Sequence, residues 1–190
     1  MNNKIVLTFA LLGSFLLASC VQVPQDDSPT SKQNNLAVSS VRDIPLSFAP
    51  GSLFSLSPKH LKHTSLKTEQ TQAVYAQYAH AIIQDLEDNG FENAKNNSAP
   101  VFQVGFSVAL ASDLSDDTIN EKFGVSPGLP ESEGLQKGSF LIYIEDAFTG
   151  KTVWRGAAQG FVHEEFSEAE QEARSSNVVS IVMAQFYATN

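Results

Sequence analysis

Two short groups of residues carry side chains that bind phosphate or metal ions in other proteins, but neither group has the full spacing. Gly150-Lys151-Thr152 matches the end of a phosphate-binding loop, yet Glu145 stands where that loop requires its first glycine. The match also lies between two expected strands and opens no helix. His60 and His63 have the i, i+3 spacing of one helix face, whereas a zinc site needs a third and a fourth ligand. We therefore expect no metal and no cofactor.

Carboxylates are the remaining candidates for catalysis. An acidic run surrounds the start of the last expected helix and consists of Glu164, Glu165, Glu168, Glu170 and Glu172. Negative charge near a helix N-terminus is favoured by the helix dipole, so we interpret this run as a solvated helix start. The sequence contains no Gly-x-Ser-x-Gly elbow and only one cysteine. These patterns predict a protein that is not an enzyme.

The one cysteine, Cys20, lies where an apolar run ends and a polar tract begins. Residues 5–17 follow a short start that carries Lys4, which is the layout of a secretory signal peptide and is too short for a transmembrane helix. Leu17-Ala18-Ser19-Cys20 resembles the lipobox of bacterial lipoproteins, in which the cysteine thiol receives a diacylglyceryl group. The alternative is an ordinary secretory signal with an incidental cysteine.

The lipobox resemblance implies a location. Two or more acyl chains give a stable membrane anchor, at about 0.8 kcal/mol per buried methylene, so the chain would sit on a membrane and incorporate palmitate at Cys20. In bacteria with two membranes, Asp directly after the lipidated cysteine favours the inner membrane, and here Val21 and Gln22 follow instead. The resemblance implies the outer membrane and its periplasmic face. A net charge of −9 argues against nucleic acid as a partner.

Composition divides the chain into three parts. Residues 1–19 form the expected signal peptide. Residues 20–40 are rich in Gln, Asp, Ser, Pro and Asn and are expected to form the lipidated N-terminus and a disordered tether. Residues 41–190 are long enough for a single domain with one substantial core.

The first half of that domain shows strand and helix signals in turn. Residues 41–58 indicate two short strands around a turn at Pro50-Gly51. Apolar residues recur at helical spacing over 69–89, and Gly90 supplies a stop signal. Strict alternation over 102–110 predicts a strand that buries one side.

The second half predicts a hairpin and a closing helix. Residues 139–146 are apolar on both faces, which is typical of a central strand, and the turn at 148–151 leads into its hairpin partner. Ser167 and Glu170 form a capping box for a helix that runs to about Tyr187. We predict an α+β fold in which a mostly antiparallel sheet of about five strands packs with two helices. Trp154 should lie in its core.

The segment "FLIYIEDAFTGKTVWRGAA", residues 140–158, resembles the most recognisable part of a bacterial lipoprotein family catalogued as domain of unknown function 4136. The Asp-Ala pair, the Thr-Gly-Lys turn and the Val-Trp-Arg-Gly strand carry the resemblance. It implies an envelope lipoprotein of the α+β fold above, and it brings no catalytic residues.

Two functions from different classes follow. The favoured one is a non-catalytic binding or structural module of the cell envelope, with another envelope protein or a cell-wall component as partner. The alternative is a periplasmic hydrolase whose carboxylates the sequence does not pair. A pocket that gathers Asp or Glu with raised pKa values would favour the hydrolase.

Two segments are candidates for partner contact. Lys59 and Lys62 form a basic cluster with two histidines, which is either a solvated surface or a contact for anionic headgroups or wall polymer. The long connection from Ser112 to Lys137 carries Ile119 and Phe123 on one side of a helical turn that Ser115 caps and Gly124 ends. That side is either a partner contact or a lid folded over the sheet, because long connections between strands can have either role.

Overall fold

The computed structural model describes residues 35–57, 65, 67–94, 98–162 and 166–190. Cys20, Lys59, Lys62 and all histidines except His80 lie outside these residues. Six strands form one sheet, in the order β1-β6-β5-β4-β2-β3. The strands are β1 (Leu36–Arg42), β2 (Leu53–Leu56), β3 (Glu92–Asn93), β4 (Phe102–Leu110), β5 (Lys137–Asp146) and β6 (Thr152–Phe161). The helices are α2 (Thr68–Asp88), α3 (Asp116–Phe123) and α4 (Glu168–Tyr187).

The α+β class is confirmed, but the sheet is mixed rather than mostly antiparallel. β1, β6, β5 and β4 pair antiparallel, whereas β2 pairs parallel with both β3 and β4. Helix α2 connects β2 to β3 and β4. A helical connection of this kind carries the chain back to the end of the sheet at which β2 begins. The next strand then runs in the same direction as β2. This crossover adds a sixth, two-residue strand to the five that the sequence predicts.

The chain enters the sheet earlier than the composition predicts. Residues 36–40, assigned above to the tether, belong to β1 and pair with β6 from Leu36↔Gly160 to Arg42↔Trp154. The polar residues that precede them hid this strand, although Leu36 and Val38 pack against the main core and the backbone pairs with β6. β1 and β2 also lie far apart in the sheet, with three strands between them.

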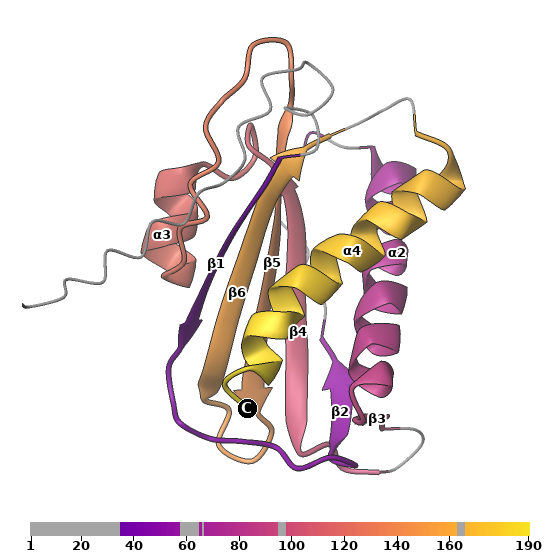
Figure 1. Cartoon of the computed structure of the whole chain (residues 1–190), viewed down its shortest axis with the longest axis vertical. Helices are drawn as coiled ribbons and strands as arrows, with labels where there is room; N and C mark the ends of the chain where they lie inside the picture. Colours follow the sequence, from indigo (N-terminus) through magenta and orange to yellow (C-terminus); the bar gives the residue numbers. More distant parts are fainter. Residues whose placement is uncertain (1–34, 58–64, 66, 95–97, 163–165) are drawn as a thin grey trace, which may run out of the picture.

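Helices α2 and α4 lie side by side on one face of the sheet, as Figure 1 shows. Alternate residues of β4 and β5 point into this layer, among them Phe106 and Ile142. Trp154, which is 1% exposed, packs against Phe186 of α4 with ring centroids 5.6 Å apart. The predicted core position of Trp154 is therefore confirmed. A Cβ at Gly156 would lie 2.3 Å from the Trp154 ring, so glycine makes this packing possible.

The second face of the sheet is covered by a third helix that the two-helix prediction omitted. Figure 1 shows α3 on the opposite side of the sheet from α2 and α4. Ala109 of β4 is buried in one apolar cluster with Ile119 of α3, so this strand is covered on both sides and not on one. No helix among the described residues has both the length and the hydropathy to cross a membrane.

Candidate functional site

Residues 112–136, called the cover segment below, fold over the second face of the sheet. The Ser115 side chain accepts a hydrogen bond from the Thr118 backbone and caps α3, while Gly124 ends the helix in a left-handed conformation with φ 62°. Both ends agree with the caps predicted from the sequence. Ile119 is fully buried in a second apolar cluster, and Phe123 is half-buried beside it. The other members of that cluster are Ala109, Leu114, Val125, Leu141 and Ala157.

Ile119 and Phe123 therefore lie where the lid interpretation places them. Ile119 is 0% exposed, so it has no surface for a partner in this arrangement. The question whether another part of the cover segment contacts a partner stays a prediction.

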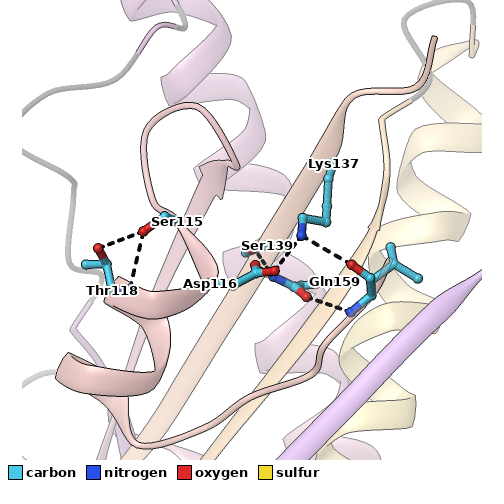
Figure 2. Close-up of polar contacts among 7 residues, drawn as sticks. Ser115, Asp116, Thr118, Lys137, Ser139 and Gln159 are labelled. Carbon is cyan, nitrogen blue, oxygen red and sulfur yellow. Dashed lines mark hydrogen bonds and ion pairs between the residues drawn. The ribbon is translucent and has the colours of Figure 1, made fainter. Parts of the chain in front are cut away.

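A polar network lies between the cover segment and the sheet. Figure 2 shows the Lys137 ammonium of β5 directed at Asp116 of α3, at a distance of 2.7 Å. Lys137 also donates to the Leu129 carbonyl at 3.2 Å. Gln159 of β6, 1% exposed, donates to Asp116 at 2.6 Å and accepts from the Leu129 amide at 3.0 Å. Its amide also donates to the Ser139 hydroxyl at 3.3 Å.

This network has the chemistry of a structural contact. The hydrogen bond from Lys137 lowers the pKa of Asp116, and Gln159 adds to that effect. A carboxylate held ionised by a neighbouring ammonium is a poor proton donor at neutral pH. The four side chains therefore hold the cover segment on the sheet and satisfy the polar groups that it buries.

Arg155, from the Val-Trp-Arg-Gly strand, holds the C-terminal end of α3, in the middle of the cover segment. Its guanidinium donates twice to the Asp43 carboxylate, at 2.8 and 2.5 Å, and once to the Phe123 carbonyl at 2.6 Å. Arg155 therefore lies on the opposite face of the sheet from Trp154, which packs against α4. These bonds join the end of β1, the middle of β6 and the last residue of α3.

A pocket of about 580 Å³ lies on the opposite face of the sheet, between the first halves of α2 and α4. The ends of β4 and β6 and the beginnings of β1 and β5 complete its walls. Its apolar lining residues include Leu36, Val74, Val108, Phe140, Ala158, Phe161 and Val178. Arg174 is the one charged residue among those that line it, and no Asp or Glu of the described ranges does so.

The floor of the pocket is formed by small residues on two paired strands. Gly138 and Gly160 stand directly opposite each other in the sheet, next to the Phe140↔Ala158 pair. Farther along the same face, the space beneath the helices is filled by the side chains of Ile142, Ile144 and Trp154. Where the pocket opens, the side chains on this face are thus a methyl group or a hydrogen atom, at Ala158, Gly138 and Gly160, in place of bulky groups. This change from large to small residues is the one sequence signal that could have located the pocket, and the sequence analysis did not use it.

Two polar side chains of the helices face each other across this pocket. Tyr78 of α2 stacks on Phe140 with ring centroids 4.8 Å apart. Burial raises the pKa of Tyr78 to about 12, and the positive charge of Arg174 opposes part of that rise. Arg174 of α4 donates to the Phe161 carbonyl at 3.0 Å. At neutral pH the pocket therefore contains a neutral phenol and one cation.

The carboxyl group of Asp85 lies elsewhere, in the last turn of α2. Burial raises the pKa of Asp85, and the hydroxyl of Tyr187 donates to it at 2.5 Å. Asp85 is not among the residues that line the pocket. The raised pKa of Asp85 therefore belongs to the contact between α2 and α4 and not to this pocket.

The family comparison agrees with the resemblance found in the sequence. A family model described as domain of unknown function (DUF4136) matches residues 45–186. The chain belongs to this family. No curated protein matches the chain significantly.

Solved structures similar to this DUF4136 chain have little sequence identity to it. A DUF4136 family protein from Bacteroides thetaiotaomicron has 15% identity and a TM-score of 0.55, covering 82% of this chain and 98% of its own. A PDZ domain protein from Parabacteroides distasonis has 10% identity and a TM-score of 0.50, covering 80% of this chain but 36% of its own. The PelC dodecamer from Paraburkholderia phytofirmans has 10% identity and a TM-score of 0.49, covering 79% and 96%. The first two similarities show a shared fold.

Proposed function

We propose that this DUF4136 protein is an outer-membrane lipoprotein, anchored through Cys20 and facing the periplasm, whose domain is a non-catalytic binding module. The pocket between α2 and α4 carries the binding part of the proposal. Its described walls are mostly apolar and contain one cation and no carboxylate. Such walls suit the retention of a ligand, because small-molecule sites are mostly apolar with a few polar groups that orient the ligand.

The position of the pocket along the chain supports its pairing with a membrane anchor. Leu36, which lines the pocket, is sixteen positions after Cys20. A fully extended chain spans at most about 3.6 Å per residue, so lipidation of Cys20 would keep Leu36 within roughly 60 Å of the membrane surface. Another envelope protein or a cell-wall component is equally within reach of a domain held at this distance.

Metabolic labelling tests the anchor. Cells that produce the wild-type chain are grown with labelled palmitate, in parallel with cells that produce Cys20→Ser, and their inner and outer membranes are separated. We expect label and outer-membrane location for the wild type and neither for Cys20→Ser. Val21→Asp is the matched control for sorting, because it should keep the label and move to the inner membrane. A wild-type chain without label would exclude the lipid anchor.

Native mass spectrometry tests binding against catalysis. Cys20→Ser chain exported to the periplasm is purified without detergent and measured before and after mild activation in the gas phase. A binding module should release a constant mass that is recovered chemically unchanged after incubation with fresh protein. Conversion of that molecule into a cleavage product over time would favour the hydrolase.

A further inference from the structure

We infer that the pocket between α2 and α4 holds a single-chain amphiphile with an anionic head group. This inference deepens the proposed binding function and rests on it. Three features of the pocket point to this ligand: the order of polarity from rim to floor, the missing side chains at the floor, and the hydrogen-bonding state of Arg174.

Polarity changes with depth in the pocket. Gln70, Gln136 and Gln171 are exposed and lie at its rim. The most buried lining residues are between 1% and 3% exposed, namely the apolar Ala109, Phe140, Ala158 and Phe161 and the polar Ser139 and Ser175. Both hydroxyls form hydrogen bonds within the protein, Ser139 with the Gln159 amide and Ser175 with the Glu172 carbonyl. A ligand that matches this gradient has a polar end near the rim and an apolar part that extends inward, because unpaired polar groups are costly among apolar walls.

The floor of the pocket has room for an apolar ligand chain and offers few polar groups to bind a polar chain. Gly138 and Gly160 leave the face between the helices without side chains at two directly paired positions. A Cβ at Gly160 would lie 3.2 Å from Nη2 of Arg174 and 3.4 Å from Leu36, so glycine also lets both side chains approach the floor. The volume of about 580 Å³ is within the usual range of roughly 300–1,000 Å³ for small-molecule sites.

The positive charge of Arg174 favours a ligand whose head group is negatively charged. A guanidinium has five N–H donors, and within the described residues Arg174 donates one hydrogen bond, to the Phe161 carbonyl. Within the described residues no carboxylate forms an ion pair with it. On a chain of net charge −9, this half-buried cation at the pocket is the feature that favours an anion over a neutral or cationic head.

Two kinds of lipid share the required chemistry, namely free fatty acids and single-chain phospholipids. The test uses the exported Cys20→Ser chain, purified without detergent, so that it does not depend on lipidation. Calorimetric titrations compare four probes: dodecanoate, lauroyl lysophosphatidylglycerol, dodecanol and dodecyltrimethylammonium, all below their micellar concentrations. We expect one or both anionic probes to bind at one site, at least about tenfold more tightly than the alcohol, and the ammonium to bind weakest.

Variants assign that binding to the pocket. Arg174→Gln should remove the preference for the anionic head while leaving residual affinity for the chain. Ala73→Trp, at an exposed lining position of α2, should fill the pocket and abolish binding of all probes. Ile181→Trp, exposed on α4 outside the pocket, is its matched control and should bind as the wild type does. Val74→Trp provides a second filling variant, and circular dichroism confirms that each variant is folded.

Clear outcomes oppose the inference. Binding of dodecanol as tight as that of both anionic probes would exclude a preference for an anionic head group. Binding that neither filling variant weakens would exclude the pocket as the binding site. Absence of binding by all four probes would overturn the inference entirely. Loss of palmitate label in the separate labelling experiment would instead reject the anchor and leave these titrations valid.

Discussion

Arg155 and Asp43, 112 positions apart in the sequence, form a two-point ion pair that joins the middle of β6 to the residue after the edge strand β1. The third donor of the same guanidinium holds the last residue of α3. Both side chains of the pair are about one-quarter exposed, with 28% for Arg155 and 25% for Asp43. Arg155, which lies in the segment 140–158 that resembles the family, therefore holds both β1 and the cover segment to β6.

A double-mutant cycle on this pair should show coupling. Asp43→Ala, Arg155→Leu and the double variant are unfolded in urea, and we expect a coupling free energy of about 1 kcal/mol, which is typical of partly exposed pairs with good geometry. Arg155→Leu should cost more than Asp43→Ala, because it also removes the bond to the Phe123 carbonyl. Additive effects within about 0.3 kcal/mol would show that the pair does not couple.

The contribution of Asp116 to stability should disappear in acid. Its folded-state pKa lies below the usual 3.8 because of Lys137 and Gln159, so the unfolded chain takes up protons first as pH falls. The stabilisation is present above the unfolded pKa and is lost as pH falls through the lower folded value. Wild type should exceed Asp116→Asn in urea stability at pH 7, and the difference should shrink below about pH 4. The exposed Asp117→Asn is the control and should show a much smaller difference. A gap that is constant from pH 7 to pH 3 would contradict this account.

Shortening the cover segment separates its structural role from a partner contact. Replacement of residues 124–134 by a short Gly-Ser linker removes Val125 and Leu129, which are 3% and 6% exposed. We expect a melting temperature lower by several degrees, because large apolar groups leave the second face. Crosslinking in intact cells then reports partners: partners lost at an unchanged melting temperature would make the segment a contact and not a lid.

Trp154 should be among the most costly residues to truncate. Trp154→Ala removes a fully buried indole from the layer between the sheet and α4, and the expected loss is roughly 3–5 kcal/mol in urea unfolding. Gly156→Ala tests the same contact from the other side, since its Cβ would meet Trp154 at 2.3 Å and Val182 at 2.7 Å. The control is Phe148→Ala, because Phe148 is 97% exposed at the hairpin tip and should tolerate truncation. An unchanged midpoint for Trp154→Ala would be inconsistent with this core.

Local signals in the sequence determined the elements that short-range physics controls. The capping box of Ser167 and Glu170 begins α4, Gly150 turns the β5–β6 hairpin with φ 66°, and Ser115 with Gly124 bounds α3. Alternation of apolar residues identified β4, and apolar residues on both faces identified β5, because both patterns are visible within the strand's own residues. The family resemblance along residues 140–158 rests on the same kind of local pattern.

Pairing between distant segments was decided only by the tertiary structure. β1 directly follows a polar tract, so its first residues were assigned to the tether, and it is a strand because its backbone pairs with β6. β2 lies parallel to β4 because α2 carries the chain back across the sheet, and no residue of β2 encodes that direction. Lys137, Asp116 and Gln159 meet for the same reason, since they come from three elements separated by turns.

The pocket belongs to the second group as well. Small residues at 138, 158 and 160 are ambiguous in one dimension, since glycine and alanine in strands also mark bulges and close backbone contacts. They form a floor because β5 and β6 align them across the sheet and because α2 and α4 do not close over them. The sequence determined which residues are small, and the packing of two helices on the sheet decided that the space above them stays open.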